Sequence, residues 1–357
     1  MRSSIGIATL LTLATLSAAA AQQAPVAGEV AEGALKGKTV TFVSYGGVYQ
    51  DGQIKALDEF VKKSGVELLS DGPTELAKVQ AQVESGNVMW DVVDTGDALP
   101  YVHCGTIFQK LDFSRIDTSK IPAGQVGECS VPATNYAVVL MYKKSVFGDN
   151  PPKSWADFFD TEKFPGTRAI PGYGDPEGYM MEIALLNDGV EKDKLFPADL
   201  DRALNKYRKM RDDGTLILWT TGAQSQQMME AGEADMAIVW SGRGKAAVAN
   251  GAEYEPVWND WIVVKDQLTI PVGSKNTDAA YALINAYLGK AAQETMTEAT
   301  SYSPINVDAT PKVDELTAKW LTNTPEKQAT AHNFNIPYWV EHNTELTEKW
   351  GAFLAGN

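Results

Sequence analysis

The sequence has few of the residues that metal sites and acid–base enzymes usually need. It contains three histidines in 357 residues, and none of them lies in a Ser-His-Asp or metal-ligand pattern. It has no G-x-S-x-G segment and no glycine-rich phosphate loop of the P-loop type. Its 46 acidic residues allow many carboxylate pairs, but no spacing favours a glycosidase site. We therefore expect no catalytic residue, no metal site and no cofactor.

Basic residues are also scarce relative to acidic ones. There are 31 lysines and arginines against 46 aspartates and glutamates, which gives a formal net charge of −15. Nucleic acids and anionic membranes both bind to basic surfaces, so this balance argues against either as a partner. The excess of acidic residues favours a soluble, monomeric protein.

Long apolar runs are absent after the first residues of the chain. The start, "MRSSIGIATLLTLATLSAAAAQQAP", has one basic residue, a short apolar run and then small residues. This pattern is typical of a secretory signal, with cleavage expected near Ala21, and the run is too short for a permanent membrane anchor. We expect an exported, periplasmic protein. The Ala/Gly/Glu-rich residues 22–37 indicate a flexible leader.

Cysteine is nearly absent, with only Cys104 and Cys129 in the chain. An exported protein folds in an oxidising compartment, so a disulfide is favoured over two free thiols. Such a bond would contribute about 3 kcal/mol in the loop-entropy model. Metal binding by this pair is disfavoured because the adjacent His103 is the sole histidine near it. The expected role is structural.

Strand-like and helix-like segments alternate along the chain. This alternation predicts an α/β fold with mostly parallel sheets, in which ligands bind beyond the carboxyl ends of the strands. A chain of 357 residues exceeds what one core usually serves, so two lobes are expected. The clearest segments are the strands at 38–45, 66–70 and 90–94 and the helices at 53–65, 74–86, 197–214 and 277–289.

The two halves of the sequence contain a weak internal repeat. With a shift of 146 positions, the apolar pair Val92-Val93 aligns with Ile238-Val239, and Thr95-Gly96-Asp97 aligns with Ser241-Gly242-Arg243. Chance matching of common residues is one explanation. The other is that each lobe ends a comparable strand at a shared cleft, one strand bringing Asp97 and the other Arg243.

Several segments resemble the extracellular solute-binding proteins of bacterial ABC importers, in the spermidine/putrescine-binding group. They are "SYGGVYQDG" (44–52), "EAGEADMAIVWSGRG" (230–244), "DQLTIPVGSKNTDAAYALINAYL" (266–288) and "TSYSPIN" (300–306). The resemblance covers nearly all of the mature chain that is expected after cleavage. It implies a small-molecule ligand, a membrane permease as partner, and two α/β lobes that close on the ligand about a hinge of two strands.

The resemblance also implies where the lobes begin and end. The first crossing between them should fall near "YAVVLMYKK" (136–144) and the return near "DQLTIP" (266–271). Residues 38–142 and 266–303 would then form lobe 1, and residues 143–265 and 304–357 would form lobe 2.

Polyamine binders of this family hold an alkyl chain between aromatic rings and its ammonium ends with carboxylates. The resemblance places Tyr45, Trp240 and Tyr302 at aromatic positions and Asp266 at the position of an acid that pairs with an ammonium. The family's other carboxylate pair should fall near Pro176 and Tyr179, so the second ammonium site is lost unless Asp175 or Glu177 replaces it. Gly46 and Ser241 lie beside the aromatic positions and are included in the candidate site, as is Asp97.

Arg243 follows the strand at 236–240 on what we expect to be a loop of small residues. A guanidinium in a cleft repels a diamine but offers two parallel donors to a carboxylate. Together with Asp266, it would select a linear solute with opposite charges at its ends, such as gamma-aminobutyrate or a similar ω-amino acid. An unpaired charge in a closed cleft would disfavour a polyamine.

Other interpretations of the same residues remain open. Arg243 could pair with a surface carboxylate, Asp266 could be a hinge residue, and the aromatic residues could belong to the core. A helix cap or turn is the favoured interpretation of Asp97. The alternative ligand is a polyamine such as putrescine, and the alternative class is an exported enzyme on the same scaffold.

Overall fold

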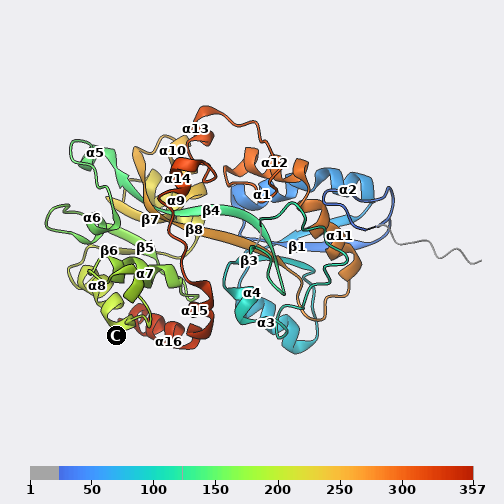
Figure 1. The fold of residues 1–357 in the computed structure, drawn as a ribbon, viewed down its shortest axis with the longest axis horizontal. Helices are drawn as coiled ribbons and strands as arrows, with labels where there is room; N and C mark the ends of the chain where they lie inside the picture. Colours follow the sequence, from blue (N-terminus) through green and yellow to red (C-terminus); the bar gives the residue numbers. More distant parts are fainter. Residues whose placement is uncertain (1–23, 123, 357) are drawn as a thin grey trace, which may run out of the picture.

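The computed structural model describes residues 24–122 and 124–356, so the expected signal segment and its cleavage near Ala21 lie outside the described residues. Within them, the chain forms two lobes that share one sheet of eight strands (Figure 1). The predicted α/β fold is confirmed. The strands are β1 (Thr39–Val43), β2 (Glu67–Asp71), β3 (Val92–Gly96), β4 (Val131–Lys143), β5 (Arg168–Pro171), β6 (Leu216–Trp219), β7 (Met236–Trp240) and β8 (Tyr254–Thr269).

The sheet is parallel at both ends and antiparallel in the middle. Its order is β2-β1-β3-β8-β4-β7-β5-β6. β1 runs parallel to β2 and β3 in one lobe, and β5 runs parallel to β6 and β7 in the other. β8 is antiparallel to β3, and β4 is antiparallel to β7. The carboxyl ends of β1 and β7 therefore approach the boundary between the lobes from opposite sides.

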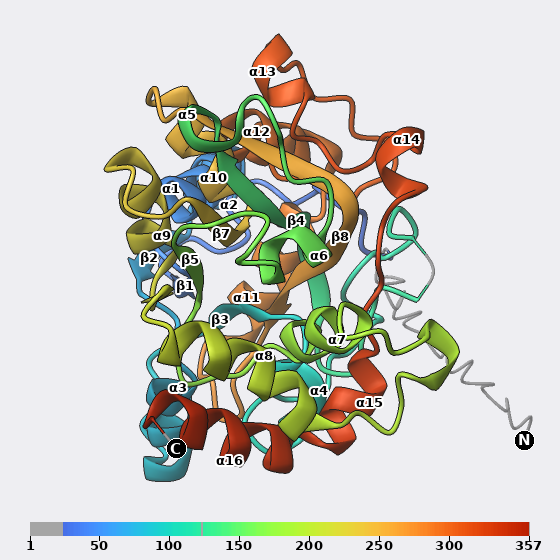
Figure 2. The same ribbon diagram turned by 90° about the vertical axis from the view of Figure 1, so that its left-hand side faces the viewer.

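Two long strands join the lobes. β4 has 13 residues and β8 has 16, and they pair antiparallel from Val131 opposite Leu268 to Lys143 opposite Tyr254. Figure 2 shows them side by side. Each overlaps the segment predicted as a crossing and begins well before it, but β4 ends one residue and β8 two residues short of the predicted ends. The register shifts at Pro132/Thr134 and Val138/Leu140, and such irregularities bend a ladder and increase its twist.

Helices cover both faces of the sheet, and their apolar stripes account for their positions. In α8, the predicted stripe of Leu200, Leu204 and Tyr207 is buried, and the Asp199 side chain accepts a hydrogen bond from the Arg202 backbone N–H at 3.0 Å. The predicted helix at 53–65 is instead two helices that meet at Leu57.

The helices beside β1–β3 are α1 (Gly47–Ala56), α2 (Asp58–Ser64), α3 (Leu76–Ser85), α4 (Leu99–Val102), α11 (Thr277–Tyr287) and α12 (Lys290–Thr300). The remaining helices are α5 (Lys144–Phe147), α6 (Trp155–Phe159), α7 (Gly178–Leu186), α8 (Leu200–Asp212), α9 (Gly222–Glu230), α10 (Ser241–Ala249), α13 (Glu315–Ala318), α14 (Pro325–Gln328), α15 (Ile336–Glu341) and α16 (Asn343–Leu354), with a 3₁₀ turn, η1 (Lys192–Lys194). No helix of the described ranges is long and apolar enough to cross a membrane.

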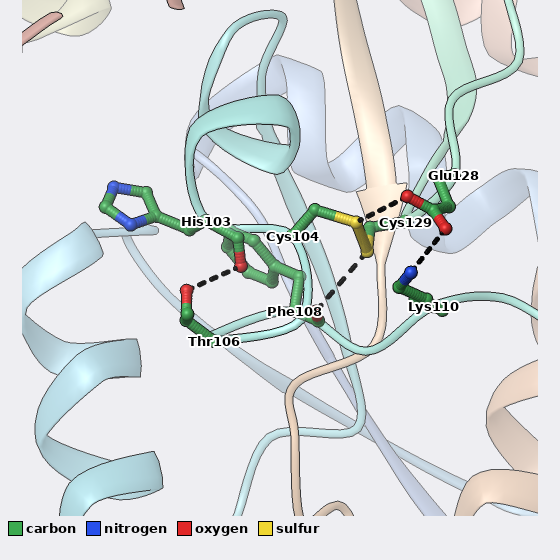
Figure 3. Close-up of a disulfide and its surroundings, with 7 residues drawn as sticks. All are labelled: His103, Cys104, Thr106, Phe108, Lys110, Glu128 and Cys129. Atoms are coloured by element: carbon green, nitrogen blue, oxygen red, sulfur yellow. Dashed lines mark hydrogen bonds and ion pairs between the residues drawn. A yellow bond between two sulfur atoms is a disulfide. The ribbon is translucent and has the colours of Figure 1, made fainter.

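The expected disulfide between Cys104 and Cys129 is present (Figure 3). The two Cα atoms lie 5.5 Å apart, and Cys129 is buried. The bond connects the turn after α4 to the segment that leads into β4. An ion pair between Lys110 and Glu128, with 2.6 Å between nitrogen and oxygen, lies beside it. The disulfide therefore fixes the approach of the chain to the first crossing strand.

Residues 24–37, for which composition indicated a flexible leader, contact the first lobe at several points. The Gly28 N–H donates to the Asn285 carbonyl at 2.9 Å, and the Asn285 side chain donates to the Val26 carbonyl at 2.7 Å. Leu35 is buried, and its N–H donates to the Ser64 carbonyl at 2.9 Å. Buried backbone groups need such partners, which local composition does not reveal.

Candidate ligand-binding site

The structure brings together most of the residues singled out in the sequence. Tyr45, which follows β1, lies across from Trp240 at the end of β7, with 6.4 Å between the ring centroids. Arg243 comes from the same lobe as Trp240, while Asp266 and Tyr302 come from the middle of the molecule, where the lobes meet. The candidate site is therefore built at the boundary between the two lobes.

Arg243 does not lie on a loop, and that expectation was wrong. α10 begins at Ser241, directly after β7, which places Arg243 in the first turn of the helix. Its side chain is only 7 % exposed, and its Nη2 donates across the lobe boundary to the carbonyl oxygen of Gly46 at 3.4 Å. Within the described part of the chain, Arg243 forms no ion pair with a carboxylate. A buried guanidinium is thus left without a counter-charge.

Two glycines allow Arg243 and Tyr302 to pack this closely against the backbone. A Cβ atom at Gly222, the first residue of α9, would lie 2.7 Å from Arg243 Nε. A Cβ atom at Gly242 would lie 2.1 Å from a ring carbon of Tyr302. Both distances are too short for real atoms. The small residues around Arg243 are therefore needed for the approach of its neighbours.

Aromatic rings surround the charged groups in two sets. Trp240 contacts Trp219 and Tyr173, at centroid distances of 5.2 and 6.1 Å, in addition to Tyr45. Tyr302 stacks on Tyr136 at 5.0 Å and lies 5.2 Å from Tyr49. Such rings present apolar faces to an alkyl chain and can attract a cation. Tyr45 and Trp240 are part-buried, so their rings are not wholly enclosed by the core.

Asp266 lies on β8, opposite Gly96 of β3 and Thr134 of β4. It is 5 % exposed, and its Oδ1 accepts a hydrogen bond from the Tyr136 hydroxyl at 3.1 Å. Burial raises the pKa of Asp266 well above its usual value, and the nearby Asp94 raises it further. Asp266 has no ion pair with a cation of the described chain. It is the acidic counterpart of Arg243.

Asp94 lies beside Asp266 but was not predicted from the sequence. This residue is fully buried on β3 and accepts hydrogen bonds through one oxygen, Oδ2, from Tyr49 at 2.8 Å, from Ser44 at 3.3 Å and from Gln53. Burial raises the pKa of Asp94 to about 7. A signal for it exists in the sequence, because Asp94 follows the apolar pair of "WDVVD" and an acid in a buried strand needs an explanation.

Asp97 and Ser241, both included in the predicted site, already have partners in the protein. Asp97 Oδ1 accepts from Gln267 Nε2 at 3.0 Å, and Lys265 Nζ lies 3.7 Å from Oδ2. Burial raises the pKa of Asp97, and the charge of Lys265 opposes the rise. Ser241 Oγ accepts from the N–H of Ala137 at 3.1 Å. These contacts hold β3 and β7 against the crossing strands.

Glu177 is the better placed of the two acids considered as replacements for the family's second carboxylate. It is part-buried, and the Tyr173 hydroxyl donates to its Oε1 at 2.7 Å, whereas Asp175 is exposed. Burial raises the pKa of Glu177 to about 7. The charge of Glu177 raises the pKa of Tyr45 and Tyr136, so it faces the same region as Asp266.

The lobes are in contact beside Arg243. The cavity there is small, about 10 Å³, and is lined by Val48, Tyr49, Gly242, Arg243, Ala246, Thr300 and Tyr302. A hollow of about 520 Å³ lies elsewhere, around α8 in the second lobe. Two of its basic residues, Arg202 and Lys206, both pair with Asp188 in the same hollow. We therefore place the candidate site at the lobe boundary and not in the larger hollow.

The chain has two α/β lobes joined by long strands, and charges without an ion-pair partner among the described residues lie where the lobes meet. These features define a two-lobed binding protein. A family model described as "Bacterial extracellular solute-binding protein" matches residues 55–329, and the chain belongs to this family. The resemblance found in the sequence is confirmed. Members of the family are substrate-binding proteins of ABC importers, which bind small molecules and work with a permease, and they are not enzymes.

Several relatives of the chain are named for the ligands that they bind. A gamma-aminobutyric acid-binding protein of Pseudomonas aeruginosa is 28% identical over 89% of this chain and 91% of its own length. A spermidine/putrescine-binding periplasmic protein of Haemophilus influenzae is 24% identical over 80% of each chain. A solved GABA receptor is 38% identical, with a TM-score of 0.78 over 90% of this chain and 98% of its own.

Proposed function

We propose that this protein is the receptor of an ABC importer for a small linear ω-amino acid, most simply gamma-aminobutyrate. The observation that carries the proposal is the buried guanidinium of Arg243, which has no carboxylate partner in the described chain and lies at the same lobe boundary as the unpaired Asp266. The ligand would supply a carboxylate to one and an ammonium to the other.

The carboxylate end of the ligand would bind at the start of α10. A helix N-terminus favours an anion, yet the first turn of α10 contains the cation Arg243. A bound carboxylate would accept two parallel hydrogen bonds from the guanidinium and would also interact favourably with the helix dipole. The start of α10 is thus an unfavourable position for an isolated arginine but a favourable one for an arginine that holds the carboxylate of a ligand.

The ammonium end would bind at Asp266, and the alkyl chain between would lie against the aromatic rings. Tyr45 and Trp240 face each other across the lobes, and Tyr302 packs beside Arg243. Closing the lobes would remove water from both charged ends, which strengthens both ion pairs. The gamma-aminobutyrate binding stated for two of the relatives supports this ligand class.

The remaining features of the receptor belong to the same proposal. Lobe 1 would comprise residues 38–142 and 266–303, and lobe 2 residues 143–265 and 304–357, with β4 and β8 as the hinge. The protein would be a monomer, exported to the periplasm after cleavage near Ala21, where it delivers its ligand to the permease without turnover.

Isothermal titration of the purified protein with gamma-aminobutyrate and with putrescine tests the ligand class. We expect gamma-aminobutyrate to bind the wild type and Arg243→Ala to abolish this binding. The same substitution should leave putrescine binding unchanged or improve it, because it removes a repelling charge. A wild type that prefers putrescine, or an Arg243→Ala variant that binds gamma-aminobutyrate normally, would contradict the proposal.

A polyamine remains the second candidate because of Glu177. This part-buried acid faces the same region as Asp266 and would offer a carboxylate to a second ammonium. In that case Glu177→Gln should weaken putrescine binding more than gamma-aminobutyrate binding. The repulsion between Arg243 and a diamine is the reason we place this candidate second.

A further inference from the structure

Asp94 and Asp266 lie side by side on neighbouring strands. Gly96 of β3 is directly opposite Asp266 of β8 in the antiparallel ladder, and Asp94 is two residues before Gly96. Residues two apart on a strand point to the same face, so Asp94 and Asp266 share one face of the sheet. Both are buried. The fold therefore places two carboxyl groups next to each other, away from water.

The hydroxyl of Tyr49 connects the two carboxyl groups. It donates to Asp94 Oδ2 at 2.8 Å, and it also lies close enough to Asp266 to lower the pKa of that residue against the larger effect of burial. The other oxygen of Asp94, Oδ1, is buried and has no hydrogen-bond partner within the described residues. One oxygen of Asp94 thus accepts three hydrogen bonds, while its other oxygen accepts none from the described residues.

No cation of the described chain neutralises this pair. Lys265 is directed to Asp97, and Arg243 bonds to the carbonyl of Gly46. Two neighbouring carboxylates in a buried site cannot both remain ionised without a counter-charge, so one of them retains a proton. Burial raises the pKa of both groups, and the charge of Asp94 raises the pKa of Asp266 further.

We propose that Asp94 and Asp266 form a proton-sharing pair, bridged by Tyr49, in which an incoming ammonium takes the place of the shared proton. The inference deepens the proposed function and rests on it, since it requires an amine ligand. The proton passes to the buffer when the ammonium binds, and no bond other than that O–H bond changes. Asp94 is then a second anchor for the amine, which explains why a buried strand contains it.

The groups that face the pair come from several elements. Besides Tyr49 of α1, they are Ser44 after β1, Gln53 of α1, Asp97 after β3, Tyr136 of β4, Tyr287 of α11, Tyr302 after α12 and, further away, Tyr45 and Glu177. Burial holds the pKa of the tyrosines above their usual value, so these stay neutral. Among the remaining groups, Glu177 is the one that could exchange a proton in the same range.

Titration of gamma-aminobutyrate into the full-length protein in two buffers with different ionisation enthalpies measures the protons released. We expect release to approach one proton per ligand at about pH 6 and to vanish by about pH 9, with affinity rising up to about tenfold per pH unit in the lower range. Asp94→Asn should abolish the release, and Tyr49→Phe, which keeps the ring packing, should reduce it. Thermal unfolding verifies that both variants are folded.

Glu177→Gln is the matched control because it removes a different acid from the same region. The inference holds if Glu177→Gln still releases the proton while Asp94→Asn does not. It is overturned if gamma-aminobutyrate binds without proton release, or if the release disappears in Glu177→Gln and persists in Asp94→Asn. If only putrescine binds, the ω-amino acid proposal fails. The proton release measured with putrescine then tests whether Asp94 and Asp266 share a proton. Failure of both ligands to bind overturns both proposals.

Discussion

Asp97 and Arg243 occupy corresponding positions in the two halves of the chain, but the structure treats them differently. Both follow an apolar strand, a hydroxyl residue and a glycine. Asp97 is buried between Gln267 and Lys265, so its charge is matched within the protein. Arg243 is buried to a similar degree, at 7 % exposed against 4 %, but among the described residues its side chain bonds only to a backbone carbonyl.

The difference shows how a candidate ligand-binding position can be distinguished from the position in the other half of the chain that has a structural role. Burying a charge costs free energy unless a partner compensates it. At Asp97 the compensation is internal and permanent, and the contact contributes to the fold. At Arg243 the compensation is missing in the described chain, and in our proposal the bound ligand supplies it. An uncompensated buried charge is therefore better evidence for a ligand than burial or position alone.

The largest effect is expected from removing the unpaired charge. Arg243→Gln keeps some hydrogen-bonding capacity but removes the charge, and we expect the affinity for gamma-aminobutyrate to fall by at least about 100-fold, or about 3 kcal/mol. Titration calorimetry checks this. Lys245→Ala, which removes a positive charge from the same helix without touching the cavity beside Arg243, should change the affinity by less than about threefold. Equal losses of affinity in Arg243→Gln and Lys245→Ala would show that the ligand responds to long-range charge alone and not to a direct contact with Arg243.

The sequence indicated those residues of the candidate site that follow recognisable segments. Trp240 ends a strand that local pattern identifies, Arg243 follows three residues later, and Asp266 begins the segment that resembles a family hinge. Asp94 was missed because its hydrogen-bond donors are 41 to 50 residues away in the chain and meet it only in the fold. The partners of Asp97 and Ser241 are 170 and 104 residues away, and the ladder register that brings them together is not visible in sequence.

The second prediction concerns the acid that should hold the ammonium. Asp266→Asn keeps the shape of the side chain and its contact with Tyr136 but removes the charge. We expect gamma-aminobutyrate affinity to fall by about 10- to 100-fold, less than for Arg243→Gln, because Asp94 remains beside it as an acid. Titration at neutral pH measures the loss. Unchanged affinity in a folded Asp266→Asn protein would mean that the amine binds elsewhere.

The third prediction compares two acids, the compensated Asp97 and the uncompensated Asp94. They should differ in how strongly they make the stability of the folded protein depend on pH. The pKa of Asp94 is about 7 in the folded protein against 3.8 without the fold, so the native state binds more protons between these values. Stability of the ligand-free protein should therefore decrease as pH rises from about 4 to 7. Glu177 acts in the same direction, with a pKa of about 7. Acids with lowered pKa, such as Asp188, act only below this range.

Thermal unfolding midpoints across this pH range test the assignment. The midpoint of the wild type should fall between about pH 5 and pH 7.5, and the fall should be shallower in Asp94→Asn, which has no charge to bury. Asp97→Asn is the matched control, because Lys265 already compensates that charge, and it should keep most of the wild-type slope. If the fall of the unfolding midpoint with pH disappears in Asp97→Asn but persists in Asp94→Asn, Asp97 and not Asp94 causes the pH dependence.

The fourth prediction addresses what the compensated position contributes. Asp97→Asn leaves Lys265 without its carboxylate, at 18% side-chain exposure, so we expect a loss of about 1 kcal/mol in stability. Gamma-aminobutyrate affinity should stay within about threefold of the wild type, since the carboxylate is not needed for the ligand. Denaturant unfolding and titration measure the two quantities. A loss of affinity greater than tenfold with intact stability would place Asp97 in contact with the ligand.

The smallest effect on binding is expected at Ser241, the residue that corresponds to Thr95 in the repeat. Its hydroxyl accepts from the N–H of Ala137 on the crossing strand β4, so Ser241→Ala leaves a buried donor without a partner. The cost should be about 1 kcal/mol of stability, with affinity changed by less than about twofold. Ser241→Thr, which keeps the oxygen, is the control that separates the hydrogen bond from the change in size. If Ser241→Ala weakens gamma-aminobutyrate binding strongly while unfolding is unaffected, the hydroxyl must turn from the strand to the ligand when the lobes close. The first turn of α10 would then bind the carboxylate with two side chains instead of one.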